Sequence, residues 1–288
     1  GRVVTIDPAT AKDLDDAVGV QRLPTGEYRI AVHIADVSHF VPEGGPVDAE
    51  ARRRCTSVYL VQRVLPMLPP VLCEQLCSLN PHEDRLAFSC CFTLREDGSL
   101  GGADGDGDVW IGRSVICVTA QLAYEVAQLI LDGEATASRP PPAEAWPAHR
   151  RPRREGEWAG VVEDVLALGA LTQRRRARRL GCEGGALTIH RTKPSFTFGP
   201  GGDVAGVRGY ETGSANQLIE ELMLMANVLT ARALHARLPL GHAVLRRHPA
   251  PSPADLESLA AKAAGAGLEL DVASAAALQR SLAAAAGG

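Results

Sequence analysis

The chain has 288 residues, 45% of them hydrophobic and 22% charged, so it can bury the core of one large or two modest domains. These proportions exclude a disordered tail, a disulfide-rich miniprotein and a collagen-like rod. The formal net charge of −4 argues mildly against a simple nucleic-acid coat. No apolar run approaches the roughly 20 residues that cross a bilayer, so we expect no membrane association.

The first part of the chain alternates β-branched runs with turns, which predicts a sheet-rich opening with two short helices. A longer helix is expected from residue 119 to about 132, where Gly133 follows. The strands are expected over 3–6, 17–20, 28–34, 86–94 and 109–118, and the short helices over 48–54 and 70–77. Seven cysteines without a Cys-x-x-Cys pair favour free thiols in a reducing compartment.

The later part of the chain is mostly helical in pattern. Residues 134 to 157 contain five prolines and an arginine run, which predicts an exposed excursion that need not divide two domains. Beyond it we expect helices over 158–180 and 216–237 that flank a hairpin-like segment, 186–210. A Ser-x-x-Gln capping box, Ser214 to Gln217, should start the second helix, and Ser252 should start an alanine-rich helical tail. The whole pattern predicts an α+β fold, a mixed β-sheet with packed helices.

Four aspartates gather in the segment TIDPATAKDLDDA, between two predicted strands: Asp7, Asp13, Asp15 and Asp16. Four like charges so close together repel one another and call for a counter-cation. Ligands that are all oxygen select a hard ion, Mg²⁺ or alternatively Mn²⁺. The competing interpretation is a solvated acidic loop. An EF-hand is disfavoured because its required glycine and glutamate are absent.

Other polar groups have structural explanations. Asp104-Gly-Asp106-Gly-Asp108 lies between two expected strands and favours a hairpin turn over a metal site. His33 and Asp36 would point to opposite faces of a strand, which favours structural roles. The window 150–193 has a net charge of +6, which suits phosphate contact and the C-terminal dipole of a helix about equally.

Several motifs together resemble the catalytic RNB domain of the ribonuclease II family. They run in family order over nearly the whole chain: TIDPATAKDLDDA, VHIADVSHFVPEG, RCTSVYLVQRVLPMLP, LCEQLCSLNP, DRLAFS, GALTIHRTKPSFTF, ANQLIEELMLMAN and AVLRRHPAP. Within that family the sequences of these motifs are most similar to those of the eukaryotic Dis-three-like exonucleases of the cytoplasmic, exosome-independent type. The resemblance implies one partial RNB domain over 1–288, with the excursion at about 134–157.

The resemblance implies a hydrolytic, processive 3′-to-5′ exoribonuclease that degrades single-stranded RNA to nucleoside monophosphates with Mg²⁺ and acts on uridylated RNA. By position, Asp7, Asp13 and Asp16 would hold metal and Asp15 would be catalytic. Tyr59 and a phenylalanine of the SFTF segment would contact RNA, either Phe196 or Phe198. The family also implies a monomer, located in the cytoplasm with P-bodies as one site, without exosome association.

The match departs from the family at the C-terminus. A Ser-Pro-Ile-Arg segment whose arginine contacts substrate phosphate is absent, as are flanking OB-type RNA-binding domains, so the chain is expected to be truncated there and inactive or feeble by itself. Two alternative functions stay open. One is a metal-dependent glycosyltransferase that uses Asp13-x-Asp15 on a nucleotide sugar, and the other is an inactive RNA-binding remnant.

Overall fold

The structure is a computed structural model that describes residues 1–60, 63–181, 186–187, 193–199, 203–210, 212–239 and 241–286. The chain forms two compact units. Unit 1 comprises Gly1–Gln173 and Gly213–Leu238, and unit 2 comprises Arg174–Thr212 and Pro239–Gly288. The boundary therefore falls within one long helix, α4 (Glu157–Gly181).

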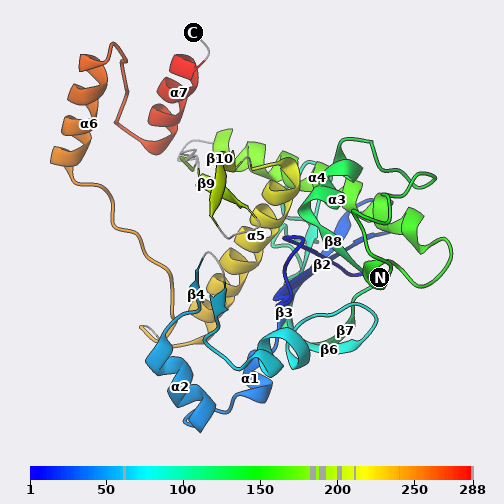
Figure 1. The fold of residues 1–288 in the computed structure, drawn as a ribbon. Coiled ribbons are helices and arrows are strands. Elements are labelled where there is room, and N and C mark those ends of the chain that lie inside the picture. Colours follow the sequence, from blue (N-terminus) through cyan, green and yellow to red (C-terminus); the bar gives the residue numbers. More distant parts are fainter. Residues whose placement is uncertain are drawn as a thin grey trace. The chain divides into compact units, whose positions relative to one another are not determined.

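Unit 1 is built on a six-stranded sheet with the order β7-β6-β3-β2-β1-β8 (Figure 1). Neighbouring strands are antiparallel, except that β1 and β8 run parallel at one edge. The strands are β1 (Val4–Asp7), β2 (Asp16–Arg22), β3 (Tyr28–Ala35), β6 (Asp84–Leu94), β7 (Trp110–Cys117) and β8 (Ala120–Ala123).

Helices and short elements surround this sheet. In unit 1 they are α1 (Val37–Phe40), α2 (Pro46–Arg54), the π-helix η1 (Val71–Leu76), α3 (Tyr124–Leu131), the 3-10 turn η2 (Ala148–Arg150) and α5 (Ser214–Arg237). A small hairpin joins β4 (Val58–Tyr59) to β5 (Val64–Leu65). Unit 2 holds an antiparallel hairpin of β9 (Lys193–Phe198) and β10 (Val204–Tyr210), and the helices α6 (Pro253–Gly265) and α7 (Ala275–Ala286).

The sheet buries apolar side chains on both faces. Along β2, Val18 belongs to the larger core, which also takes residues of α3, α4 and α5, whereas Ala17 belongs to a smaller core with Leu72 and Leu79. Because successive strand residues point to opposite faces, the two cores lie on opposite sides of the sheet. The smaller core also contains Leu14, from the loop that carries the aspartates.

The observed architecture confirms the predicted α+β class with a mixed sheet and packed helices. The apolar stripe expected on the helix over 216–237 is buried as predicted, at Leu218, Ile219, Leu222, Met225, Ala226 and Leu229. Among the described residues, no helix combines the length and apolarity needed to span a bilayer.

Two local predictions were wrong. The helix expected from residue 119 begins only at Tyr124, because Ala120–Ala123 pair with β1 as a strand and are buried on both faces. The capping box predicted for Ser214 does not form. Instead, Asn216 accepts a hydrogen bond from the Gly213 N–H at 3.1 Å, and Gln128 of α3 accepts one from the Ala215 N–H at 3.1 Å.

The Pro- and Arg-rich segment over 134–157 is exposed at most of its positions but is anchored to unit 1. Trp146 is only 2% exposed, and its indole N–H donates to the Gln121 carbonyl at 2.8 Å. Trp158 packs against Trp146 with ring centroids 4.8 Å apart. The segment is thus a structured surface excursion, while the expectation of one partial domain over 1–288 stays a prediction.

Candidate active site

The chain segment between β1 and β2 positions the four aspartates. Asp7 is the last residue of β1 and Asp16 the first of β2, and the two strands are antiparallel with Val4 opposite Val18. The loop over 8–15 therefore returns the chain to the same end of the strand pair. Asp7 is only 8% exposed, Asp16 is half-buried, and Asp13 and Asp15 are exposed.

Residues far away in the sequence hold this loop. The Ser78 hydroxyl accepts a hydrogen bond from the Leu14 N–H at 3.0 Å and donates to the Lys12 carbonyl at 2.8 Å. The Leu79 N–H donates to the Leu14 carbonyl at 2.9 Å, and Leu14 itself is 1% exposed in the smaller core. The backbone from Lys12 to Leu14, on both sides of Asp13, is thus fixed by a buried apolar anchor and three hydrogen bonds.

Burial and neighbouring negative charge disfavour the ionised form of three of the aspartates. Burial, and then the charge of Asp16, raise the pKa of Asp7 from its ordinary 3.8 to about 7. Burial, and then the charge of Asp15, raise the pKa of Asp16 to about 6. Desolvation and the charge of Asp13 also raise the pKa of Asp15. These groups would be stabilised as carboxylates by a nearby cation, since opposite charge favours the ionised form.

The donor set fits a hard divalent cation. Asp7 Oδ2 is buried without a hydrogen-bond partner, and within the described ranges no Lys, Arg or His forms an ion pair with any of the four aspartates. Carboxylate oxygens are the ligands that Mg²⁺ selects. In the part of the chain that the structure describes, however, no three His, Cys, Asp or Glu side chains converge closely enough to form a ready-made metal site.

The predicted RNA-contacting residues lie on two hairpins. Tyr59 is 72% exposed on β4, where its ring is available to a ligand. Phe196 and Phe198 lie on β9 by their backbone, but their side chains fall outside the described residues. The β4–β5 hairpin belongs to unit 1 and the β9–β10 hairpin to unit 2.

The other polar clusters have structural partners. His33 Nδ1 lies 2.6 Å from the Ser89 hydroxyl, whereas Asp36 forms an ion pair with Arg113 at 3.0 Å. His33 and Asp36 thus have separate partners, which favours structural roles for both, and Asp36 lies just beyond the end of β3 at Ala35. The segment with Asp104 and Asp106 forms the turn between β6 and β7, as expected.

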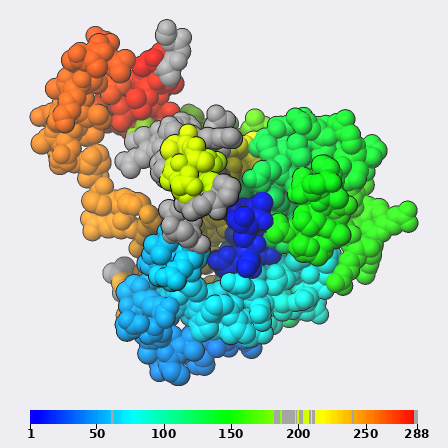
Figure 2. Space-filling model, in the orientation of Figure 1, coloured from blue at the N-terminus to red at the C-terminus, as the bar shows by residue number. Residues whose placement is uncertain are grey.

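Two residues that support the aspartate loop were not predicted from the sequence. Ser78 lies 64 residues from Leu14, and no local pattern marks it as a support of the aspartate loop. Arg150 lies in the Pro- and Arg-rich segment, and its Nη1 donates to the Ala9 carbonyl at 2.9 Å. The only sequence signal for it was that Arg150 begins the window 150–193, which has a net charge of +6. On the face shown in Figure 2, the dark blue start of the chain reaches the surface between the cyan and green segments.

The family profile of the RNB domain matches residues 1–287. This chain belongs to the RNB domain family. It is 41% identical over 284 residues to DIS3-like exonuclease 2 of Xenopus tropicalis, covering 97% of this chain and 32% of that protein. It is 40% identical over 280 residues to a protein of Arabidopsis thaliana named inactive exonuclease DIS3L2, covering 97% of this chain and 25% of the relative.

Solved structures agree with this assignment. Mycoplasma genitalium RNase R in complex with ribose-methylated single-stranded RNA is similar with a TM-score of 0.76 and 26% identity, over 92% of this RNB chain and 37% of that chain. The identities of 41% and 40% to the two DIS3-like relatives confirm the expected resemblance to the Dis-three-like exonucleases. The chain spans a third or less of the length of the two curated relatives, so the activity of the whole protein belongs to the proposal below.

Proposed function

We propose that this protein is a hydrolytic, processive 3′-to-5′ exoribonuclease that degrades single-stranded RNA to nucleoside monophosphates, with uridylated RNA as a preferred substrate. The observation that carries the proposal is the cluster of carboxylates at the β1–β2 loop of an RNB chain, where burial and mutual repulsion disfavour the ionised form. Asp7, Asp15 and Asp16 all have raised pKa values, and Asp7 Oδ2 has no partner. A site of this kind is organised to receive positive charge.

Each aspartate then has a distinct role. Asp7 and Asp16, at the end of β1 and the start of β2, would be the main ligands of Mg²⁺, or of Mn²⁺ in its place, with Asp13 in support. When bound, such ions supply an activated water and neutralise the charge that develops on the scissile phosphate. Asp15 is proposed as the catalytic carboxylate. A raised pKa makes it a better proton acceptor toward the attacking water.

The remaining parts of the proposal concern the RNA. Tyr59, the most exposed aromatic of the β4–β5 hairpin, would stack on a base near the scissile end, and Phe196 or Phe198 would stack on another. Single-stranded RNA as the substrate is supported by the RNase R structure, whose complex contains it. By resemblance we also propose a monomer in the cytoplasm, including P-bodies, that acts without the exosome.

The decisive experiment assays the full-length protein that contains this chain on uniformly labelled single-stranded RNA, with Mg²⁺ and with EDTA. We expect nucleoside monophosphates only with the metal, and no reaction on RNA whose 3′ end is blocked. Asp15→Asn should leave RNA binding near normal and lower cleavage about a thousandfold, which corresponds to a loss of ~4 kcal/mol in transition-state stabilisation. Asp104→Asn, in the exposed turn between β6 and β7, is the matched control.

Comparable turnover in Asp15→Asn would overturn the catalytic assignment. A trap of unlabelled RNA tests processivity, because a processive enzyme finishes the labelled strand before it rebinds. Parallel RNAs with and without a 3′ oligouridine test the substrate preference.

A second candidate is an inactive RNA-binding protein, favoured by the Arabidopsis relative that is named inactive. It predicts RNA binding without release of monophosphates by the full-length protein. No observation favours the glycosyltransferase alternative, which predicts turnover of a nucleotide sugar instead.

A further inference from the structure

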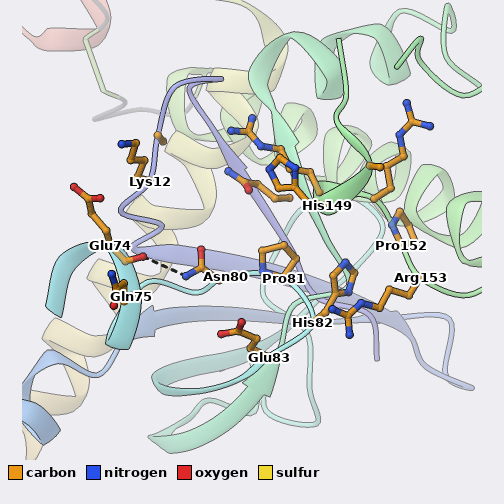
Figure 3. A pocket seen from close by; sticks show the side chains of 15 residues that line it. Lys12, Glu74, Gln75, Asn80, Pro81, His82, Glu83, His149, Pro152 and Arg153 are labelled. Carbon is orange, nitrogen blue, oxygen red and sulfur yellow. Dashed lines mark hydrogen bonds between the residues drawn. The ribbon is translucent and has the colours of Figure 1, made fainter. Parts of the chain in front are cut away.

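A pocket of about 670 Å³ opens in unit 1 beside the aspartate loop (Figure 3). Three chain segments line most of it: Ala11 and Lys12 of the loop, residues of the segment 74–83, and residues 148–153. Its volume lies in the range of small-ligand sites. The pocket shares the loop over 8–15 with the aspartate cluster, but the four aspartates themselves do not line it.

Positive charge dominates this pocket. Among the described residues, none of its four cationic side chains forms an ion pair with a carboxylate. Figure 3 shows Lys12 on one side and Arg153 on the opposite side. The four cations are Lys12, Arg150, Arg151 and Arg153.

Neutral acceptors hold two of the guanidinium groups in place. Arg150 Nη1 donates to the Ala9 carbonyl at 2.9 Å, and Arg151 Nε donates to the Trp146 carbonyl at 2.7 Å. The Arg151 guanidinium also lies over the Trp146 ring, 5.6 Å from its centroid. Carbonyl acceptors and an aromatic ring orient a cation without cancelling its charge, so the positive potential stays available to a ligand.

The guanidinium groups also retain unused donors. Arg150 Nε and Arg151 Nη2 are buried and have no hydrogen-bond partner. Such donors are costly to leave unsatisfied, and an anion that draws either side chain toward it would satisfy them.

The two carboxylates at the pocket offset only part of this charge. Glu83 forms an ion pair with Arg85, which does not line the pocket, and Glu74 lies on the same side as Lys12 in Figure 3. Two histidines, His82 and His149, add imidazole groups that can donate hydrogen bonds. The remaining imbalance favours an anion with several acceptor oxygens.

We propose that this pocket binds the phosphate group of a nucleotide, at a site separate from the aspartate cluster. Guanidinium groups match phosphate oxygens in a forked geometry, and an ammonium group such as Lys12 adds a point charge. The choice of a nucleotide rests on the proposed function. Two sources share the chemistry: an internal phosphodiester of bound RNA, and the nucleoside 5′-monophosphate released from it.

The test measures binding to the purified full chain in EDTA, so that neither metal bridging nor cleavage contributes. The probes are uridine 5′-monophosphate, uridine, inorganic phosphate and a single-stranded RNA without a terminal phosphate, each titrated by calorimetry or fluorescence anisotropy. The variant is Lys12→Gln combined with Arg153→Gln. Both side chains are exposed and form no hydrogen bond with a described residue, so their removal should leave the fold intact. Arg232→Gln combined with Lys262→Gln, on exposed positions of α5 and α6, is the charge-matched control.

We expect uridine 5′-monophosphate or the RNA to lose about tenfold in affinity in the double variant and to keep it in the control, while uridine binds neither protein. Loss for the monophosphate alone identifies the released nucleotide as the ligand. Loss for the RNA, with a shallower salt dependence, identifies the phosphodiester. Unchanged affinity for both probes overturns the proposal. If the full-length protein binds a probe through this pocket but releases no monophosphates with Mg²⁺, the proposed function fails and this inference stands.

Discussion

Replacing Asp7 by Asn should stabilise the metal-free protein at neutral and alkaline pH. Asp7 is 8% exposed, Asp7 Oδ2 has no partner, and burial together with the charge of Asp16 raises its pKa from 3.8 to about 7. The folded state therefore resists loss of this proton. The carboxylate is the form that the fold tolerates least, and Asn removes the charge at nearly the same volume.

The magnitude follows from the pKa difference. Each pKa unit corresponds to about 1.4 kcal/mol, so a shift from 3.8 to about 7 costs the fold roughly 4 kcal/mol once Asp7 is fully ionised. The sign is that of an acid whose folded-state pKa is raised. The contribution of Asp7 to stability is fully present below about pH 4, is lost as the pH rises to about 7, and then levels off. The amide of Asn needs its own partners, so we expect a net gain of about 2 kcal/mol at pH 8.

The assay is urea unfolding in EDTA at pH 5, 6, 7 and 8, with equal m-values as the condition for comparing free energies of unfolding. Asp104→Asn, an exposed carboxylate in the turn between β6 and β7, is the control and should follow the parent protein. Addition of Mg²⁺ should stabilise the parent more than Asp7→Asn, because a ligand that binds the folded state adds to its stability. If Asp7→Asn is less stable than the parent protein at pH 8, or keeps the same pH dependence, then the fold does not disfavour the ionised form of Asp7.

Three further variants probe the supports of the site. Ser78→Ala removes the hydroxyl that bonds the Leu14 N–H and the Lys12 carbonyl, and should lower the free energy of unfolding by about 1–3 kcal/mol in urea titrations, with weaker Mg²⁺ binding. No loss in either measurement would contradict its role. Trp146→Ala should cost about 3–5 kcal/mol in the same titrations, because this 2%-exposed ring anchors the segment 134–157; a cost below about 1 kcal/mol would show that the segment is not anchored there. Tyr59→Ala should leave stability unchanged and lower RNA affinity by about 1–3 kcal/mol in anisotropy titrations, whereas Tyr59→Phe retains it. Equal RNA affinity in the two variants would argue against stacking.

Most helices and strands were predictable because their signals are local. The stripe of apolar residues on α5 follows from the spacing of residues within one helix. The cap of α6 is also local, because the Ser252 hydroxyl accepts a hydrogen bond from the Asp255 N–H at 3.1 Å. The strand Ala120–Ala123 was not predictable in this way. Four residues carry too little periodicity to override the helical pattern that follows, and only pairing with β1 makes them a strand.

Caps supplied from another element also escaped prediction. A Ser-x-x-Gln pattern marks Ser214, but Gln128 reaches the start of α5 from α3, 87 residues from Ala215 in the chain. A helix end needs partners for its N–H groups, and any acceptor that the fold brings near can supply them. Local sequence therefore identifies a helix start better than it identifies the atoms that satisfy it.

The candidate site divides in the same way. The sequence by itself determined the aspartates, their spacing around one turn, the surplus of arginine in the segment 134–157, and the family, because all of these are properties of residue identity and order. Only the tertiary structure decided that Asp7 is buried while Asp15 is exposed, that Ser78 supports the loop, and that Arg150 meets Ala9 beside it. The physical reason is that desolvation and charge coupling depend on which distant segments pack around a group. Asp7 and Asp16 carry identical side chains, and their pKa values rise to about 7 and about 6 only because the fold buries them beside other carboxylates.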